Sequence, residues 1–368
     1  MQPTAREIPS FHEKFFSHQL ITWQKGHGRH DLPWQNTRDP YKIWLSEVML
    51  QQTQVTTALP YFQRFIENYP TVERLSTADL EDVLRLWSGL GYYSRARNLL
   101  AAAKIVEDRY GGKFPSSYAS LIELPGVGDS TAAAIAAFSS GERVSIFDGN
   151  VQRVFSRYLG YSEDLSASRN RRLLKEQVDR YLPPPPASIE DMTAYTQGLM
   201  DLGSSVCAPK TPNCRACPVV ENCKGYRSGL PAQYPVKTKK PLRKQKIWYM
   251  WVFKNPDGQM WLEKRPVKGI WPSLFSFPTT EIPSAPFGKH HAEIREGGPI
   301  RHSLTHMDIA IFYAVVPIDA PTACQVSASS VDGCWVDFQA ALNFGIPQPV
   351  KKIIHALLLQ CDVKSLDA

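Results

Sequence analysis

Cys207-Ala-Pro-Lys-Thr-Pro-Asn-Cys214-Arg-Ala-Cys217-Pro-Val-Val-Glu-Asn-Cys223 is the stretch that decides the fold, because it places four thiols in one short, proline-punctuated loop. Four cysteines this close in sequence can surround an iron–sulfur cluster or a zinc ion. Zinc ribbons usually present two Cys-x2-Cys pairs far apart, whereas this loop has one such pair between two single thiols. The spacing therefore favours a 4Fe–4S cluster, with zinc as the alternative and unligated or disulfide-bonded thiols as a third interpretation.

The composition is that of a globular protein with a moderate positive charge. A chain of 368 residues with 43% hydrophobic residues can build two or three domains. The net charge of +7 is compatible with a nucleic-acid partner but does not require one. No apolar run reaches the roughly 18 residues of a membrane span, and the first thirty residues do not have the pattern of a signal peptide. With the scattered Cys324, Cys334 and Cys361, these features indicate a reducing, cytoplasmic compartment and no membrane association.

Two patterns of secondary structure divide the chain. From residue 8 to about 225, apolar residues recur at helical spacing, and prolines break the region into short helices. Strand patterns follow at 247–253, 260–262 and 309–316, with a closing helix near 350–359. The stretch 235–246 between them is basic and has no acidic residue. We therefore expect a multidomain protein with an all-α domain at 1–228, a basic linker at 229–246 and a smaller α+β domain at 247–368.

A glycine-containing turn lies inside the helical region, in Leu121-Ile-Glu-Leu-Pro-Gly-Val-Gly-Asp-Ser-Thr-Ala-Ala-Ala-Ile135. The pattern predicts a helix end, a tight turn and an alanine-rich helix. Gly126 and Gly128 would let the backbone approach another surface closely, and the free N–H groups of the next helix suit a phosphate. An ordinary loop between helices is the alternative, because short turns of this kind are common. The cysteine loop in the same helical region favours a phosphate contact.

The hairpin, Asp148 and the four-cysteine loop together resemble the helix-hairpin-helix DNA glycosylases related to endonuclease III. Further segments, at 32–34, 44–55, 89–98 and 148–151, are similar to the adenine DNA glycosylases of the MutY type, nearly end to end. The resemblance implies a helical catalytic domain, a hairpin near 121–135, and one 4Fe–4S cluster in the loop 207–223. It also implies base excision repair on double-stranded DNA, with adenine removed opposite 8-oxoguanine or guanine. We expect a monomer.

Two acidic residues are the predicted catalytic pair. Glu47 shares a helix face with mostly apolar residues, so desolvation should raise its pKa and keep a proton for the departing adenine. Its alternative role is that of a surface glutamate. Asp148 precedes a predicted helix from Val151, where an N-cap is the alternative and is compatible with catalysis. The resemblance implies that both converge on one nucleoside, where Asp148 stabilises the sugar cation and Asn150 orients the sugar.

Ser130 stands where related bifunctional enzymes have a lysine that forms a Schiff base and cuts the strand. Serine cannot form one, so we expect base removal without efficient strand cleavage. Two competing hypotheses are an endonuclease III-like glycosylase-lyase for oxidised pyrimidines and a non-catalytic iron–sulfur DNA-binding protein. Ser130 argues against the first, and the pair of Glu47 and Asp148 argues against the second.

The resemblance assigns the remaining DNA contacts of the helical domain. An adenine in a duplex must be flipped into a pocket, for which the resemblance implies Trp34 and Gln197. A core tryptophan and a solvated glutamine are the alternatives. The residues that wedge into the duplex and contact the orphaned base are Gln52, Thr53, Leu90 and Tyr92. Candidate phosphate partners, with an exposed helix face as the alternative, are Arg95, Arg97 and Lys104.

The C-terminal domain resembles the Nudix-like module of the same family, in the segments 264–278 and 302–306. It lacks a glutamate-rich helix in 279–298, so we do not expect pyrophosphate hydrolysis. The implied role is recognition of 8-oxoguanine by Ser303, Thr305 and His306, with a structural turn as the alternative role of the histidines. Many relatives have Phe-Ser-His where this chain has Leu304-Thr305-His306, and a glycine pair where it has Pro272-Ser273. Thr305 retains a hydroxyl, so we expect lesion discrimination to persist.

Overall fold

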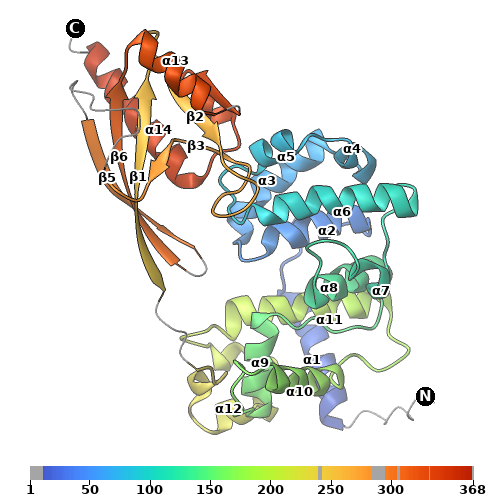
Figure 1. Ribbon diagram of the computed structural model, residues 1–368. Coiled ribbons are helices and arrows are strands. Elements are labelled where there is room, and N and C mark those ends of the chain that lie inside the picture. Colours follow the sequence, from blue (N-terminus) through green and yellow to red (C-terminus); the bar gives the residue numbers. More distant parts are fainter. Residues whose placement is uncertain (1–10, 239–242, 284–294, 305–306, 331, 367–368) are drawn as a thin grey trace. The chain divides into compact units, whose positions relative to one another are not determined.

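The computed structural model describes residues 11–238, 243–283, 295–304, 307–330 and 332–366. The chain divides into two compact units, which are coloured along the sequence in Figure 1. Unit 1 consists of residues 1–77 and 101–240, and unit 2 consists of residues 78–100 and 241–368. A segment inside the helical half of the sequence therefore belongs to the same unit as the C-terminal domain.

Unit 1 is helical, as the sequence predicts. Its helices are α1 (Phe11–His27), α2 (Pro40–Leu50), α3 (Val55–Asn68), α4 (Val72–Ser76), α7 (Tyr118–Leu121), α8 (Asp129–Ser140), α9 (Gly149–Leu159), α10 (Ser168–Asp179), α11 (Ile189–Asp201) and α12 (Lys224–Arg227). A π-helical turn, η1 (Leu202–Val206), extends α11, and short 3₁₀ turns follow at η2 (Cys214–Ala216), η3 (Val220–Asn222) and η4 (Pro231–Gln233). Helix α6 (Ser94–Tyr110) starts in unit 2 and continues into unit 1.

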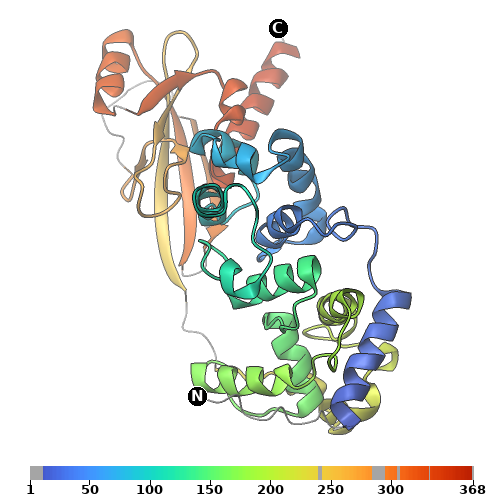
Figure 2. The ribbon, with the colours of Figure 1, turned by 90° about the vertical axis from the view of Figure 1, so that its right-hand side faces the viewer.

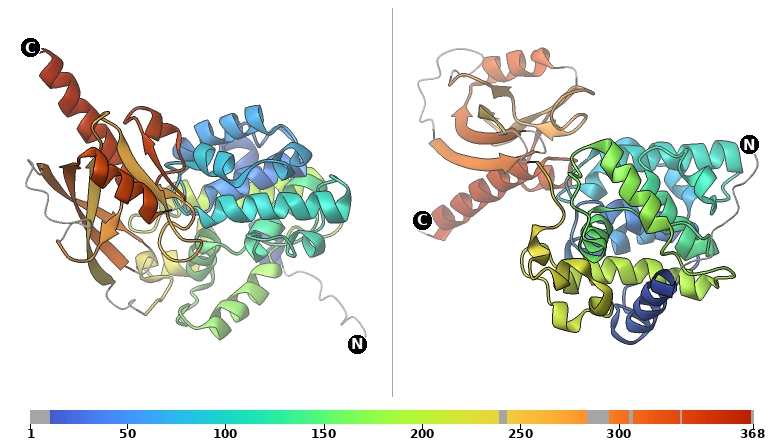
Figure 3. Two further views of the ribbon diagram at one scale, coloured as in Figure 1. Left: turned by 45° about the horizontal axis from the view of Figure 1, so that its top comes forward. Right: turned by 90° about the horizontal axis from the view of Figure 1, so that it is seen from below.

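Local sequence explains where the helices of the site begin. Asp39 caps α2 by accepting a hydrogen bond from the Tyr41 N–H, and Pro40 occupies the first helical turn. Six consecutive residues of α8, 132–137, are buried, because their mostly alanine side chains allow neighbouring helices to approach from several sides. Helices α2 and α11 both pack against α8, and α11 also packs against α1 (Figure 3). This arrangement holds the two helices that carry the candidate site on one small-residue helix.

Unit 2 contains helix α5 (Leu80–Trp87) and a mixed sheet. Its other elements are β1 (Lys244–Lys254), β2 (Met260–Lys264), β3 (Phe275–Ser276), β4 (Thr279–Thr280), β5 (Arg295–Ser303), β6 (Met307–Pro317), α13 (Ala320–Ser329), β7 (Gly333–Val336), η5 (Ala340–Asn343) and α14 (Gln348–Leu366). The main strand order is β3-β2-β1-β6-β5, with β4 paired to β1 and β7 paired to β2. Strands β1 and β6 are parallel, from Lys244 opposite Met307 to Lys254 opposite Pro317, and the other pairs are antiparallel.

The sheet of unit 2 is covered by a helix on each side (Figure 2). Trp251 and Phe253 of β1 form a core cluster with Val316 of β6 and Val326 of α13. Met250 and Val252 alternate with them and are also buried, as expected for a strand covered on both faces. The predicted strands at 247–253, 260–262 and 309–316 correspond to β1, β2 and β6, and the predicted closing helix to α14. Within the described residues, no helix is long and apolar enough to cross a membrane.

Candidate active site

A cavity of about 230 Å³ in unit 1 brings three of the predicted site residues together. Trp34, Glu47 and Gln197 come from the segment before α2, from α2 and from α11, and all three line this cavity. Trp34 is buried and packs its ring edge-to-face against Phe62 at a centroid distance of 5.1 Å. A rigid aromatic wall beside polar side chains suits a planar heterocycle.

Glu47 has the environment that a general acid requires. Its carboxyl group faces the cavity but is otherwise surrounded by protein, so desolvation raises its pKa from 4.5 to about 8. The negative charge of Asp148 is the second cause of this rise, so the two acidic groups lie within electrostatic reach of each other. Glu47 therefore holds a proton at neutral pH, and the predicted pair shares one region of unit 1.

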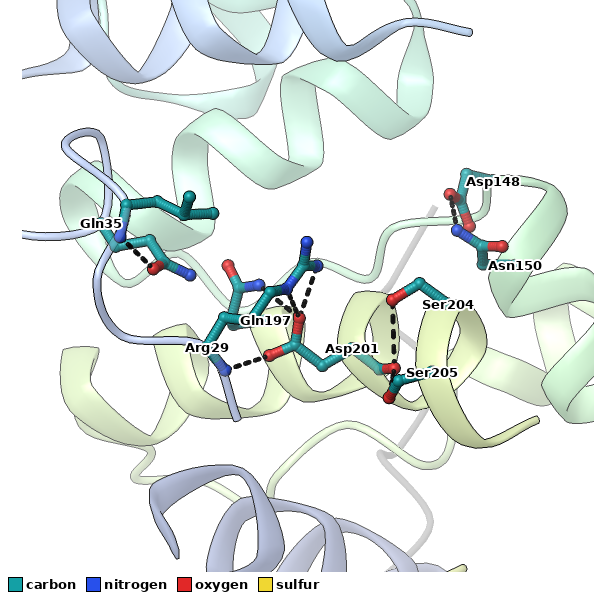
Figure 4. Close-up of polar contacts among 9 residues, drawn as sticks. Arg29, Gln35, Asp148, Asn150, Gln197, Asp201, Ser204 and Ser205 are labelled. Atoms are coloured by element: carbon teal, nitrogen blue, oxygen red, sulfur yellow. Dashed lines mark hydrogen bonds and ion pairs between the residues drawn. The ribbon is translucent and has the colours of Figure 1, made fainter. Parts of the chain in front are cut away.

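Asp148 caps helix α9, as one of the sequence-based alternatives proposed. Its Oδ1 accepts a hydrogen bond from the Val151 N–H at 2.8 Å, and its Oδ2 accepts one from Asn150 Nδ2 at 3.3 Å (Figure 4). Two N–H donors and a helix N-terminus suit a carboxylate. Glu47 and Asp148 thus occupy contrasting environments, one in a desolvated cavity and the other among hydrogen-bond donors.

The amide group of Gln197 is oriented by a buried carboxylate. Gln197 Nε2 donates to Asp201 Oδ1 at 2.9 Å, one helical turn further along α11. Asp201 also accepts from Arg29, at 2.7 Å from Nε and 3.1 Å from the backbone N (Figure 4). Because its amide nitrogen is bound to Asp201, Gln197 turns its carbonyl oxygen to other partners as an acceptor.

Gln35 presents the opposite polarity to the same cavity. Its Oε1 accepts a hydrogen bond from the Leu32 N–H at 3.1 Å, which fixes the orientation of the amide (Figure 4). Its Nε2 is buried and has no hydrogen-bond partner within the described part of the chain. A buried unpaired donor in a cavity is costly unless a ligand accepts from it. Gln197 therefore offers an acceptor to a ligand in this cavity, and Gln35 holds in the cavity wall a donor without a partner among the described residues.

The predicted glycine hairpin joins α7 to α8 and is tied to α2. Gly126 has φ of 78°, a left-handed conformation that favours glycine, and Gly128 is the N-cap of α8. Gln51 Nε2, at the end of α2, donates to the Gly126 carbonyl at 3.3 Å. Ser130 Oγ accepts from the Phe147 N–H at 3.1 Å, so this residue helps to position the segment that leads to Asp148.

The two predicted wedge positions of unit 1 follow α2 directly. Gln52 is exposed and has φ of 57°, which is uncommon for a residue other than glycine. The Thr53 N–H donates to the Leu50 carbonyl at 3.2 Å, which closes this turn. Strained, exposed residues of this kind are frequent at functional sites.

Unit 2 carries the other wedge residues. Tyr92 is 46% exposed and has φ of 48°, whereas Leu90 is only 6% exposed. Arg95 is also buried and donates to the backbone carbonyls of Leu90 and Gly91, so its charge supports the loop, in contrast to the predicted phosphate contact. Arg97 is partly buried and donates to the Pro272 carbonyl. The sequence pattern did not distinguish these internal arginines from surface ones.

A second cavity, of about 380 Å³, lies within unit 2. Tyr92 lines it together with Trp271, His302 and Ser303, so the structure brings one wedge residue and one predicted reading residue to the same cavity. The rings of Trp271 and His302 meet edge-to-face at a centroid distance of 5.3 Å. Thr305 and His306 lie outside the described residues.

The four cysteines of the loop at 207–223 surround one small, mostly apolar cavity, together with Arg157. In the part of the chain that the structure describes, no three His, Cys, Asp or Glu side chains are arranged to hold a single ion. The donor set itself, four thiols around one cavity, fits an iron–sulfur cluster. Arg157 is buried and donates to the carbonyls of Cys207, Ala208 and Pro209, so a fixed cation organises the loop backbone.

A hydrogen-bond path connects this loop with Asp148. Arg153 Nη2 donates to Asn150 Oδ1 at 2.8 Å, and Arg153 Nε donates to the Cys207 carbonyl at 2.8 Å. Asn150 in turn donates to Asp148. The conformation of the cysteine loop can therefore influence the position of the Asp148 carboxylate.

Sequence reasoning missed Arg29, Gln35 and Asp201. The spacing of Gln197 and Asp201, four residues apart on one helix, was the available signal for one of these contacts. Arg29 and Gln35 come from an irregular segment, and their roles depend on contacts that no periodic pattern encodes.

Both halves of the chain are similar to known proteins. The family model "HhH-GPD superfamily base excision DNA repair protein" matches residues 45–180, and the "NUDIX domain" model matches residues 249–356. The chain is 35% identical to the adenine DNA glycosylase of Buchnera aphidicola subsp. Schizaphis graminum, over 92% of this chain and 98% of the relative. It is 28% identical to the adenine DNA glycosylase of Mus musculus, over 92% and 77% of the two chains. A solved thermostable thymine-DNA glycosylase is similar over 59% of this chain and 97% of its own, with 28% identity and a TM-score of 0.53.

Proposed function

Because the chain belongs to the adenine DNA glycosylases of base excision repair, we propose that it removes adenine mispaired with 8-oxoguanine or guanine and leaves the strand uncut. The observation that carries the proposal is the cavity in which a protonated Glu47 meets the amide groups of Gln35 and Gln197. Adenine carries an amino donor next to ring-nitrogen acceptors, whereas guanine has an oxygen in place of that amino group. One protein acceptor beside one protein donor matches the adenine edge.

The reaction uses the contrast between the two acidic groups. Glu47 donates its proton to a ring nitrogen of the extruded adenine, the C1′–N9 bond breaks, and the bonding electrons leave with the base. The Asp148 carboxylate stabilises the positive charge that develops on the sugar. A water molecule then adds to C1′, and its proton returns to Glu47. Ser130 has no amine with which to form a Schiff base, so the strand remains intact.

The second cavity supports a role in reading the base opposite adenine. It combines Tyr92, an exposed aromatic ring, with the hydroxyl of Ser303 and the ring pair of Trp271 and His302. Aromatic side chains that enter a base step offset part of the unstacking cost, and polar groups beside them can distinguish base edges. We assign recognition of 8-oxoguanine to this cavity.

We further propose that Cys207, Cys214, Cys217 and Cys223 hold a 4Fe–4S cluster. When bound, the cluster would brace the loop that carries Lys210, Arg215 and Lys224 toward DNA phosphates. The mispair-containing duplex would be bound by a monomer, at the nucleoid.

One gel assay tests the function. A duplex with a single A:8-oxoguanine pair is incubated with the protein under single-turnover conditions, with and without subsequent alkali. Strand cleavage that appears only after alkali is the expected result, and a duplex with an A:T pair is the control. Adenine release by Glu47→Gln at the wild-type rate would refute the catalytic assignment, and borohydride trapping of a protein–DNA adduct would favour a lyase.

A further inference from the structure

We propose that the loop 88–93, which carries Tyr92, is positioned by the C-terminal domain, with Tyr93 and Ser88 as the positioning residues. The inference rests on the proposed reading of 8-oxoguanine and extends it. Reading the lesion and wedging the duplex would then be coupled through a defined set of hydrogen bonds. The loop belongs to unit 2 by its own packing, although it lies between helical segments in the sequence.

Two hydrogen bonds fasten the loop to one backbone carbonyl of the C-terminal domain, and a third lies within the loop. The Tyr93 hydroxyl donates to the Ile346 carbonyl at 2.8 Å, and the Ser88 hydroxyl donates to the same oxygen at 3.1 Å. The Tyr93 hydroxyl also accepts from the Gly89 N–H at 3.2 Å. The two bonds to the Ile346 carbonyl lie away from water, because Tyr93, Ser88 and Ile346 are 7%, 8% and 0% exposed. Buried bonds of this kind specify one loop position.

The loop needs such support, because its backbone is unusual. Gly89 and Gly91 have φ values of 99° and 77°, and Tyr92 itself has φ of 48°. A left-handed tyrosine is strained and persists only where its surroundings fix it. From inside unit 2, the Trp87 Nε1–H donates to the Gly91 carbonyl at 3.0 Å, and the Arg95 guanidinium lies over the Tyr92 ring, 5.5 Å from its centroid. Tyr92 alone is left facing outward.

The residue before Ile346 is bonded to the strand that follows one lining segment of the second cavity. Next to Ile346, the Gly345 carbonyl accepts from the Phe275 N–H at 2.9 Å. Phe275 follows the segment 269–272, which lines the cavity, and Pro272 accepts a hydrogen bond from Arg97 at 3.1 Å. A base that enters the cavity and displaces 269–272 would therefore act on the loop through two short paths. Through this network, the position of Tyr92 would depend on which base occupies the cavity.

Tyr93→Phe tests the coupling, because it removes one hydroxyl and keeps the ring. The matched control is Tyr161→Phe, which removes a comparable bond to the Asn170 carbonyl (2.9 Å) in unit 1. Single-turnover excision is measured on A:8-oxoguanine and on A:G duplexes for each protein. We expect Tyr93→Phe to lower the rate ratio of the two duplexes by about fivefold or more, mainly through the 8-oxoguanine duplex. Tyr161→Phe should keep the wild-type ratio.

If Tyr93 has a purely structural role, Tyr93→Phe lowers both excision rates by the same factor. An unchanged ratio of the two rates, with or without such a loss, therefore overturns the inference. A second readout uses Glu47→Gln with 2-aminopurine in place of adenine, whose fluorescence reports base extrusion. Adding Tyr93→Phe should reduce the extrusion opposite 8-oxoguanine more than opposite guanine, and an equal reduction argues against coupling. Failure of the proposed function is seen separately, because it would leave the wild-type protein without excision or without lesion preference.

Discussion

The raised pKa of Glu47 predicts that both catalysis and stability depend on pH in a defined way. With a pKa of about 8, roughly nine-tenths of the molecules carry a protonated Glu47 at pH 7 and about one-tenth at pH 9. If this proton is the one given to adenine, the single-turnover rate should be nearly flat below pH 7. Above pH 8 it should fall about tenfold per pH unit.

The same pKa sets a linkage between proton binding and folding. In the unfolded chain Glu47 ionises near the ordinary glutamate pKa of 4.5, whereas in the folded chain its pKa of about 8 keeps it protonated to higher pH. Between these values the folded state binds more protons, so stability falls as the pH rises through the interval. The difference corresponds to a loss of roughly 3–4 kcal/mol between pH 5 and pH 9.

Glu47→Gln separates this linkage from all other titrations, since the amide has nearly the same shape and cannot ionise. The free energy of unfolding of wild type and variant is measured in urea at pH 5 and at pH 9. Relative to wild type, the variant should be more stable at pH 9 than at pH 5 by about 3 kcal/mol. Glu67→Gln, at an exposed position on α3, is the control and should show no such trend. Parallel stability curves for Glu47→Gln and wild type would refute the reasoning, as would a rate that stays constant up to pH 9.

Three further substitutions probe the rest of the site. Gln35→Leu keeps the size of the side chain and removes the hydrogen-bond donor, so the single-turnover rate of adenine excision should fall by roughly tenfold. An unchanged excision rate would show that the ligand does not accept a hydrogen bond from Gln35. Asp201→Asn frees the amide of Gln197 to turn over and weakens the bond to Arg29. The variant should therefore lower the excision rate by about tenfold and also lower the melting temperature. Wild-type values for both would contradict the orienting role of Asp201. Ser130→Lys places an amine at the hairpin, and borohydride should then trap a covalent DNA adduct that wild type does not form; its absence would indicate that this position does not reach the sugar.

The features that could be predicted from the sequence are those indicated by residues close together in the chain. The strand at 247–253 reads as an unbroken apolar run because both of its faces are buried, and it appears as part of β1. Asp148 is followed by a helix and caps it. Glu47 could be assigned a raised pKa because its helix neighbours are apolar, and burial does raise it. In each of these cases the prediction used only residues that are neighbours in the sequence.

The elements that sequence did not predict depend on contacts between distant residues. The spacing of Arg95 and Arg97 in a helix is equally compatible with a solvated face, but Arg95 is buried under the carbonyls of its own loop. Likewise, the pattern of 80–87 predicts a helix without indicating which core it joins. Contacts with distant residues show that it belongs with the C-terminal domain: Glu81 pairs with Lys264, and Ser88 and Tyr93 donate to Ile346, more than 250 residues away.

The two cavities lie in different units, which has a consequence for how the two bases of a mispair are recognised. In the proposed function, adenine is recognised by buried amide groups whose orientation is set by Asp201 and the Leu32 N–H, and all of these groups belong to unit 1. The wedge residue Tyr92 and the reading residue Ser303 line a cavity of unit 2 and owe their positions to that unit. A protein organised in this way can test the two bases of a mispair on separate scaffolds. Substitutions in the second cavity should therefore change which mispair is chosen while the chemistry at Glu47 and Asp148 continues unaltered.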